Sequence, residues 1–357
     1  MDYYFLIITV IDVFVLGTMC VFSKYNDTFN REQRNWFIWS FLLIIVISVL
    51  EVIAVMVDKG PASLRLVNIA ANYLGFGLTP AVSVCLAAAL GKRPSIKYAL
   101  ASEGIYMLFM AVSYPLGLVF YIDTDNNYMR GDYFWIYLAA YFAGIIYLLM
   151  MTLEVAKKYQ NKNRNSIYSI SVFLIIGTTV QVILPNLHVT WLCISLLSIL
   201  YYTYCTSMWQ QIDALTGLLN QKSYLYHTGE LSSKGTLIVF DIDDFKQVND
   251  KYGHPTGDKC LREVAECIKH AYAKNGFCYR IGGDEFCVIL KEKEDEESCY
   301  REFIRELNTR RESFDILPFV SAGSAYFEAG ENALKVKEVA DTNMYRVKKE
   351  HKSGYQA

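Results

Sequence analysis

The chain has 357 residues, of which 53% are apolar and only 20% are charged, and its formal net charge is −2. This length suffices for two domains, and the apolar content is high for a soluble protein. No block of lysine and arginine could cover a phosphate backbone, so a nucleic-acid partner is not expected. The nine cysteines form no CxxC pair, so neither a zinc site nor a disulfide framework is expected. Residues 1–205 carry long apolar runs, whereas residues 206–357 have the composition of a soluble domain.

The first 205 residues contain seven long apolar segments. They cover about residues 3–22, 37–57, 66–90, 98–121, 134–154, 168–184 and 189–205. A helix needs about 20 mostly apolar residues to cross a bilayer, so each segment is a candidate span. The first segment lacks a basic start, which predicts a retained helix rather than a cleaved signal peptide. We expect seven spans, or six if the last two segments form a re-entrant hairpin.

The loops between these segments alternate in positive charge. The odd-numbered loops are the basic ones, with Lys24, Arg31 and Arg34, then Lys92, Arg93 and Lys97, then Lys157, Lys158, Lys162 and Arg164. The even-numbered loops hold Lys59 and Arg65, then Arg130, then no lysine or arginine around residues 185–188. Because basic loops are retained on the cytoplasmic side, we expect a multi-pass cell-membrane protein with its N-terminus outside and its C-terminal domain in the cytoplasm.

Several polar side chains fall within or beside the apolar segments. They are Asp12, Glu51, Asn72, Glu103, Glu154 and Gln181. Such residues are costly in a membrane and either build a ligand or ion site or hydrogen-bond between helices. Both interpretations stay open for Asp12 and Glu51, whereas helix packing is favoured for Glu103 and Glu154 near the membrane edges. The ligand of such a sensor is unknown from the sequence.

Residues 206–212 join the last apolar segment to the soluble part. They contain neither glycine nor proline, so we expect a helical linker that continues the last membrane helix. No separate soluble sensor fits between the two parts, and a signal would therefore pass along this helix. Inserting one to four residues after Trp209 should then change activity with helical periodicity, and a flat response would contradict this hypothesis.

The remaining segment has a mixed α/β pattern. Residues 235–242 (GTLIVFDI) form an apolar, β-branched run of strand length, and residues 256–274 have apolar side chains at helical spacing. Residues 277–281 and 285–290 flank Gly282-Gly283, which is typical of a β-hairpin. A helix over 295–310, a strand over 316–327 and a helix over 333–350 are expected to follow.

Acidic side chains come directly after the predicted strand and the predicted turn. Asp241 and Asp243 end the strand at 235–242, and Asp284 and Glu285 follow the glycine pair. Carboxylates at adjacent strand ends suit hard divalent cations, which phosphoryl transfer needs to neutralise phosphate charge. A single acid pair at a turn is usually only solvated charge, but four acids with Lys246 nearby favour a metal-dependent nucleotide site.

Three further polar residues follow the first acid pair: Asn249, His254 and Asp258. Amide and carboxylate oxygens can accept hydrogen bonds from the N1–H and N2 amine of guanine. The segment therefore suits recognition of a guanine base beside the metal.

These residues closely resemble the GGDEF family of diguanylate cyclases. Residues 213–220 (DALTGLLN) are similar to the family's opening motif, and residues 280–286 (RIGGDEF) are similar to its signature. Residues 240–250, together with Gly253-His254 and Gly257-Asp258, are similar to its FDIDxFKxINDxxGHxxGD stretch. The resemblance implies a helical membrane bundle over 1–205, the linker over 206–212 and an α+β GGDEF domain over 213–357. The implied sheet is mainly antiparallel and similar to a nucleotide cyclase or polymerase palm.

The resemblance also implies a role for each matching residue. Asp241, the carbonyl of Ile242 and Asp284 would bind Mg²⁺ or Mn²⁺. Asp284 with Glu285 would help to deprotonate the attacking 3′-hydroxyl, and Lys246 would stabilise phosphate charge. The substrate-binding set would be Asn249, His254, Asp258, Gly282, Gly283 and Lys348, with Asn249 and Asp258 on the guanine.

The sequence departs from the family pattern at three places. The opening motif is followed by Gln221 where arginine is usual, and Ala273 and Gly276 replace the inhibitory RxxD motif, so product feedback is not expected. The closing helix reads VKKEHK over 347–352, where Lys352 stands in for the usual arginine. None of these departures affects an expected metal ligand.

The leading interpretation is a membrane-bound cyclase that condenses two GTP into cyclic di-GMP and two pyrophosphates. Each domain of the family holds one GTP, so a homodimer is implied. Two alternatives are a catalytically silent receptor for GTP or cyclic di-GMP, and a transporter or channel with a regulatory tail. The intact signature argues against the first, and the lack of an inverted internal repeat against the second. No hydrolase domain of the EAL or HD type is expected.

Overall fold

The computed structural model describes residues 3–91, 94–161, 164–183, 189–229, 231, 233–291 and 295–354. The chain divides into two compact units, Met1–Gln210 and Gln211–Ala357. Lys92, Arg93, Lys162 and residues 185–188, which entered the charge argument, lie outside the described residues, and so does the side chain of Gln181.

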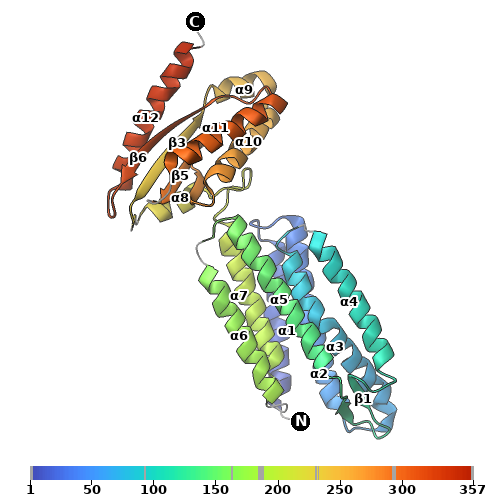
Figure 1. Cartoon of the computed structure of the whole chain (residues 1–357). Helices are drawn as coiled ribbons and strands as arrows, with labels where there is room; N and C mark the ends of the chain where they lie inside the picture. Colours follow the sequence, from blue (N-terminus) through green and yellow to red (C-terminus); the bar gives the residue numbers. More distant parts are fainter. Residues whose placement is uncertain are drawn as a thin grey trace. The chain divides into compact units, whose positions relative to one another are not determined.

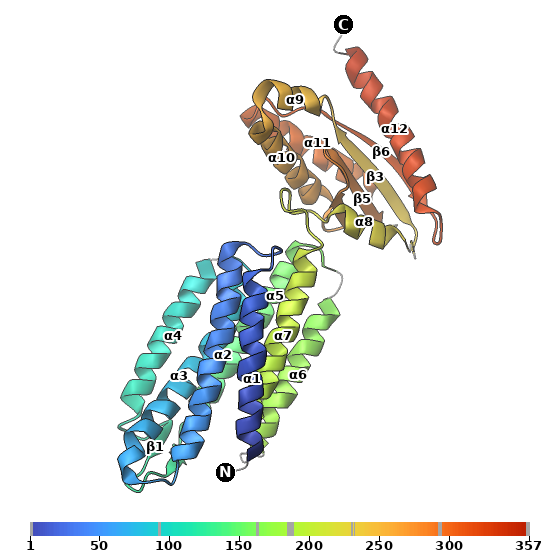
Figure 2. The same cartoon turned by 180° about the vertical axis from the view of Figure 1, so that it is seen from behind.

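The first unit is a bundle of long helices (Figures 1 and 2). Its described helices are α1 (Tyr3–Lys24), α2 (Arg31–Val57), α3 (Arg65–Ala88), α4 (Pro94–Ser113), α5 (Trp135–Lys158), α6 (Arg164–Ile183) and α7 (Thr190–Trp209), with a short 3-10 turn η1 (Ala62–Leu64). Their buried apolar side chains form a core that draws on α1, α2, α3, α5, α6 and α7. Each apolar segment of the sequence therefore corresponds to a helix of this bundle.

One of the expected spans is shorter than the sequence suggested. The helix expected over 98–121 ends at Ser113, because Pro115 cannot continue a helix and Gly117 adopts a left-handed φ of 64°. Residues 120–122 form strand β1 (Phe120–Ile122), which pairs antiparallel with β2 (Tyr128–Arg130). This hairpin lies at one end of the bundle (Figure 1).

Five helical segments are long and apolar enough to cross a membrane: Tyr4–Lys24, Arg31–Val57, Ala62–Ala88, Trp135–Lys158 and Thr190–Trp209. Within the described part of the chain, α4 and α6 are not in this set, so the expected count of seven spans is not confirmed. Large apolar side chains nevertheless point outward from the bundle, as Phe14 and Phe22 do on α1. Such a surface is compatible with a lipid environment.

The segment expected to be a helical linker is helical only in its first part. Helix α7 ends at Trp209, Gln210 and Gln211 form a turn, and Ile212 pairs with Leu219 in an isolated bridge. The helix therefore stops before the second unit begins, because Ile212 and Leu219 already engage each other as extended backbone.

The second unit is built on a four-stranded antiparallel sheet with the strand order β4-β5-β3-β6. Its elements are α8 (Gln221–Thr228), β3 (Gly235–Ile242), α9 (Phe245–Tyr252), α10 (His254–Tyr272), β4 (Gly276–Arg280), β5 (Glu285–Lys291), α11 (Glu296–Ser313), β6 (Val320–Phe327) and α12 (Ala333–Gly354). The strands and helices predicted after residue 235 are all present, and the antiparallel sheet is confirmed.

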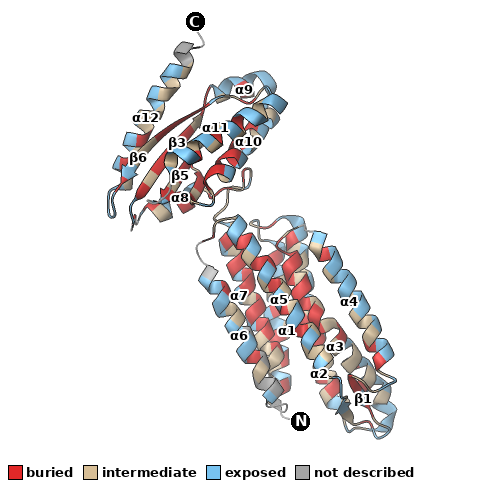
Figure 3. Cartoon of the chain, in the orientation of Figure 1, coloured by how far each residue is buried: buried red, intermediate tan, exposed pale blue. Residues whose placement is uncertain are grey.

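Side chains alternate between the two faces of the sheet, and helices cover both faces (Figure 3). Ile238 and Phe240 of β3 pack with α10 and α11, whereas Leu237 and Val239 pack with α8 and α12. Central strand β3 is therefore apolar on both sides, which explains its continuous apolar run. Only its carboxyl end carries acids.

Helix α12 lies directly against β6, as both views show (Figures 1 and 2). A Cβ on Gly323 of β6 would come within 2.1 Å of the backbone nitrogen of Met344 and 2.4 Å of the carbonyl oxygen of Ala340. Only glycine allows this approach of helix to strand. The approach brings the last turns of α12 to the acidic end of β3.

Candidate functional site

The acidic residues converge at one edge of the sheet. In the antiparallel register, Asp241 at the end of β3 lies opposite Glu285 at the start of β5 and opposite Ser321 of β6. The backbone nitrogen of Ile242 donates a hydrogen bond to the carbonyl oxygen of Asp284 at 3.4 Å. Strand β3 ends where its antiparallel neighbours β5 and β6 begin. Asp241 and Asp284 therefore meet at this edge, although they are 43 positions apart in the sequence.

Lys348 of α12 forms an ion pair with Asp241 at this edge. Burial raises the pKa of the Asp241 carboxyl; Lys348 opposes that rise, while Asp284 and Asp243 reinforce it. The pKa of Lys348 is raised, because its hydrogen bond to Asp241 and the surrounding carboxylates outweigh the opposing effect of burial. The edge therefore holds several mutually repelling carboxylates and a lysine that compensates part of their charge.

A second contact between α12 and β3 was not expected from the sequence. His351 Nδ1 lies 2.8 Å from Oδ2 of Asp243, and Ser321 donates a 2.7 Å hydrogen bond to Oδ1 of the same carboxylate. Asp243 is buried, with only 8% of its surface exposed. The one available signal was the spacing of Lys348 and His351, because residues three apart share a face of a helix.

The glycine turn between β4 and β5 is fastened by Arg280. Its guanidinium donates to the carbonyl oxygen of Gly283 at 2.8 and 3.3 Å and to both carboxylate oxygens of Asp213 at 3.2 and 3.3 Å. Burial alone would raise the pKa of Asp213, but hydrogen bonds from Thr216 and the charge of Arg280 outweigh it and lower that pKa. The opening motif and the signature turn, which are separate motifs in the sequence, are therefore one structural unit.

The residues expected to bind substrate lie on α9 and α10, beside the sheet. Asn249 is half-buried, and its side chain packs against Gly257, where a Cβ would come within 2.0 Å of Oδ1. Asp258 follows on α10 and is half-buried, whereas Lys246 and His254 are exposed. Within the described residues, no hydrogen bond or ion pair joins these four side chains to the acids of the sheet.

The remaining expected residues have different positions. Gly282 and Gly283 form the turn, with Gly283 exposed and no atom within 4 Å of a Cβ built on it. Such an open backbone leaves room for a bound nucleotide. The side chain of Lys352 lies outside the described residues.

The acidic edge fits a divalent cation that is shared with a substrate. In the described parts of the chain, no three or more His, Cys, Asp or Glu side chains cluster as metal ligands. Magnesium, however, typically binds one or two carboxylates and completes its shell with waters and phosphate oxygens. Asp241, Asp284 and the Ile242 carbonyl are the groups that could hold such an ion, and the electrostatic repulsion among the acids favours a cation there.

The second unit is thus an antiparallel sheet with helices on both faces and acids gathered at one edge. Residues 210–354 match the sequence family described as "Diguanylate cyclase, GGDEF domain". The second unit is therefore a GGDEF domain of the diguanylate cyclase family.

Several characterised proteins are similar to this part of the chain. Diguanylate cyclase DgcS of Shewanella oneidensis is 32% identical over 158 residues, which cover 42% of this chain and 53% of that protein. Diguanylate cyclase DosC of Escherichia coli is 28% identical over 39% of this chain and 33% of its own length. The chain thus spans about half of one relative and a third of the other.

One solved structure is also similar. The GGDEF domain of DgcB from Caulobacter crescentus, in complex with c-di-GMP, is 32% identical, and the match covers 40% of this chain and 89% of that domain with a TM-score of 0.36.

Proposed function

We propose that the protein is a membrane-bound diguanylate cyclase that condenses two GTP molecules into cyclic di-GMP and two pyrophosphates. The observation that carries this proposal is the acidic edge of Asp241, Asp284 and Glu285, placed beside the open glycine turn and a lysine from α12. The domain family and the names of the relatives support the same reaction class.

The reaction forms two phosphodiester bonds and breaks two phosphoanhydride bonds. Each 3′-hydroxyl attacks the α-phosphate of the other GTP, loses its proton, and displaces pyrophosphate. Asp284 with Glu285 would accept or guide that proton, and Lys246 and Lys348 would offset phosphate charge. A divalent cation bound by Asp241, Asp284 and the Ile242 carbonyl would neutralise charge on the phosphates.

The proposal assigns base recognition to α9 and α10. Asn249 and Asp258 would contact the guanine edge, because an amide and a carboxylate can accept from its N1–H and N2 amine. Gly257 lets the two helices approach closely enough to hold Asn249 beside α10. His254, at the first position of α10, would contact the same nucleotide.

A homodimer follows from the chemistry of the product. One domain presents one acidic edge, and a symmetric product made from two GTP requires two such edges that face each other. The active form would therefore contain two copies of the chain, with one GTP bound to each.

The proposal places the first unit in the cell membrane with seven spans, the N-terminus outside and the GGDEF domain in the cytoplasm. Besides the five long apolar helices, α4 exposes Ile105, Leu108 and Val112, each with about two-thirds of its surface accessible: 69%, 68% and 68%. Helix α6 exposes Ile176 in the same way. These outward side chains support membrane contact for α4 and α6, and the basic odd-numbered loops support the orientation.

Product formation by detergent-purified full-length protein tests the cyclase. The assay follows cyclic di-GMP by mass spectrometry after incubation with GTP and Mg²⁺ or Mn²⁺, beside Asp284→Asn and the exposed control Asp315→Asn. Product from the wild type and the control, with none from Asp284→Asn, is the expected result. If none of the three forms product while GTP still binds, the alternative of a silent GGDEF receptor replaces the proposal.

A further inference from the structure

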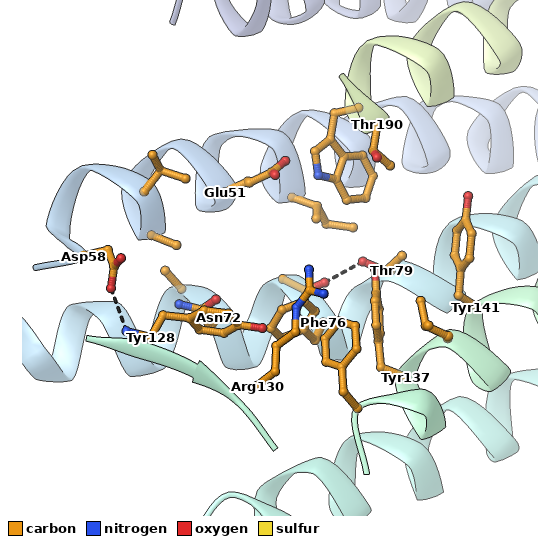
Figure 4. Close-up of a pocket in the computed structure, with 18 of the residues that line it drawn as sticks. Glu51, Asp58, Asn72, Phe76, Thr79, Tyr128, Arg130, Tyr137, Tyr141 and Thr190 are labelled. Atoms are coloured by element: carbon orange, nitrogen blue, oxygen red, sulfur yellow. Dashed lines mark hydrogen bonds between the residues drawn. The ribbon is translucent and has the colours of Figure 1, made fainter. Parts of the chain in front are cut away.

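A cavity of about 640 Å³ lies within the first unit, among α2, α3, α5, β2 and the start of α7 (Figure 4). Sites for small molecules typically have volumes of about 300–1,000 Å³, apolar walls and a few converging polar groups. The proposed cyclase chemistry uses none of these residues. The proposed cyclase activity therefore does not account for this cavity.

The periodicity of each element explains why these side chains share one cavity. On α2, Ile47, Glu51 and Ala54 recur at spacings of four and three, which keeps them on one face of the helix, and Asp58 follows directly after the helix. On β2, Tyr128 and Arg130 line the cavity and Met129 between them does not, although Arg130 is also exposed to solvent. Strand β2 thus brings a cation to a cavity whose opposite wall carries Glu51.

Aromatic rings form much of the wall. The centroid of Phe76 lies 4.8 Å from that of Tyr137 and 5.8 Å from that of Phe134, and Tyr141 and Trp191 complete the lining. Phe76 packs edge-to-face against both Phe134 and Tyr137, and Tyr141 stacks on Tyr137, so these rings support one another in the wall. The faces of such rings attract cations as well as apolar groups.

The charges in the cavity come from two walls. Figure 4 shows Glu51 extending from α2 and Arg130 reaching in from the facing side. The Arg130 guanidinium lies 4.7 Å from the centre of the Phe134 ring, and Asp58 accepts a 2.7 Å hydrogen bond from the backbone nitrogen of Tyr128. With two carboxyl groups and one guanidinium, the lining has one more acidic than basic side chain.

The wall that carries Arg130 is held firmly in place. Asn126, in the turn of the β1–β2 hairpin, donates to the carbonyl oxygen of Val57 at 2.6 Å and accepts from Asn68 at 3.0 Å. Arg65 donates to the carbonyl oxygens of Ile122 and Asp123 at 2.8 and 2.7 Å. These bonds join the hairpin to α2 and α3, so the cavity exists before any ligand binds.

We propose that this cavity binds a small organic ammonium compound with an apolar body, an amine or an amino acid. The ammonium group would pair with Glu51, and the body would lie against Phe76, Tyr137 and Trp191. Arg130 would contact the carboxylate of an amino acid and would have no such partner in an amine. A bare metal ion fits less well, because the lining is mostly aromatic and offers too few oxygen ligands for so large a space.

The site is independent of the cyclase proposal, since its test measures binding directly. Under the proposed orientation, the α2–α3 turn and the β1–β2 hairpin lie on the outer side of the membrane. The cavity would then receive its ligand from outside the cell.

The test uses full-length protein in lipid nanodiscs and three probes that share a phenyl body: phenylethylamine, phenylalanine and phenylacetate. Calorimetric titration should show saturable binding of phenylethylamine, phenylalanine or both, and none of phenylacetate. Binding of only phenylalanine would assign its carboxylate to Arg130, and Arg130→Gln should then abolish the preference. Equal or tighter binding of phenylacetate, or no binding of either amine, would overturn the proposal.

Variants of Glu51 identify the site. Glu51→Gln keeps the shape but removes the charge and should weaken binding about ten- to hundredfold. Glu51→Asp should retain most of the affinity, which separates loss of charge from misfolding. Glu103→Gln makes the same chemical change on α4, outside the cavity lining, and should leave binding unchanged. Unchanged affinity in Glu51→Gln would refute the assignment.

Discussion

His351 Nδ1 lies 2.8 Å from Oδ2 of Asp243, although the two residues are 108 positions apart in the chain. Three positions before His351, Lys348 forms an ion pair with Asp241. Two side-chain contacts thus join α12 to the end of β3, each with an acid of the candidate site. The position of this helix and the electrostatics of the site are therefore coupled.

The contact of His351 with Asp243 should contribute to the stability of α12. We expect His351→Ala to lower the free energy of local opening of α12 by about 1–2 kcal/mol, since it removes one hydrogen-bond partner of a buried carboxylate. Amide hydrogen exchange of α12, measured on the full-length protein, would detect the change.

His270 offers a matched control for this experiment. It lies 3.4 Å from Glu302, but its side chain is 56% exposed, so His270→Ala should change exchange of neighbouring amides very little. Equal effects of the two substitutions would show that the contact with Asp243 has no special role.

Lys348 should compete with a divalent cation for Asp241. We expect Lys348→Met to bind Mn²⁺ at a lower concentration than the wild type, because the carboxylates lose their internal counter-charge. Cyclase activity should nevertheless fall, since Lys348 is also proposed to offset the negative charge of the substrate phosphates. Electron paramagnetic resonance of Mn²⁺ and product formation measure the two effects separately, and weaker metal binding in Lys348→Met would contradict the competition.

Gly257→Ala should disturb substrate binding without unfolding the domain. The new Cβ would come within 2.0 Å of Asn249 Oδ1, and a side-chain end can move away at small cost. The displaced amide would no longer meet the guanine, so KM for GTP should rise about tenfold. Gly229→Ala is the control, because its Cβ meets no atom closer than 3.4 Å. An unchanged KM for GTP in Gly257→Ala would show that Asn249 does not bind the substrate.

The pairing of Asp213 with Arg280 should make stability depend on pH in the acidic range. The pKa of Asp213 is lowered in the folded state, so its contribution is present above the unfolded value of about 3.9 and is lost as pH falls through the folded pKa. Asp213→Asn should therefore destabilise the segment around residues 213–219 by about 1–3 kcal/mol at neutral pH.

The difference in segment stability between Asp213→Asn and the wild type should persist down to about pH 4 and shrink only below it. Hydrogen exchange of the residues 213–219, compared at pH 7, 5 and 4 for both proteins, would measure this course. A difference that already disappears near pH 6 would assign the stability to a group other than Asp213.

Local patterns in the sequence were sufficient to predict the four strands of the second unit and helices α10, α11 and α12, whereas α8 was not predicted. The apolar run of β3 and the glycine pair before Asp284 each specify a strand or a turn through short-range steric and hydrophobic preferences. The expected helix over 98–121 was wrong after residue 113, because a hydropathy pattern does not show that Pro115 and Gly117 end a helix. The predicted roles of Asp284, Lys246 and Asn249 remain predictions.

The sequence by itself determined strands β3 and β5 and the acids that end the first and begin the second. It could not show that Lys348 and His351 reach Asp241 and Asp243, because those contacts depend on the close approach of α12 to Gly323. The sequence likewise does not show that Glu51 and Arg130 line one cavity, because the bundle and the hairpin bring them together. Local preferences act over a few neighbouring residues, whereas such pairings arise from packing between elements that are distant in the chain, and only the tertiary structure decides them.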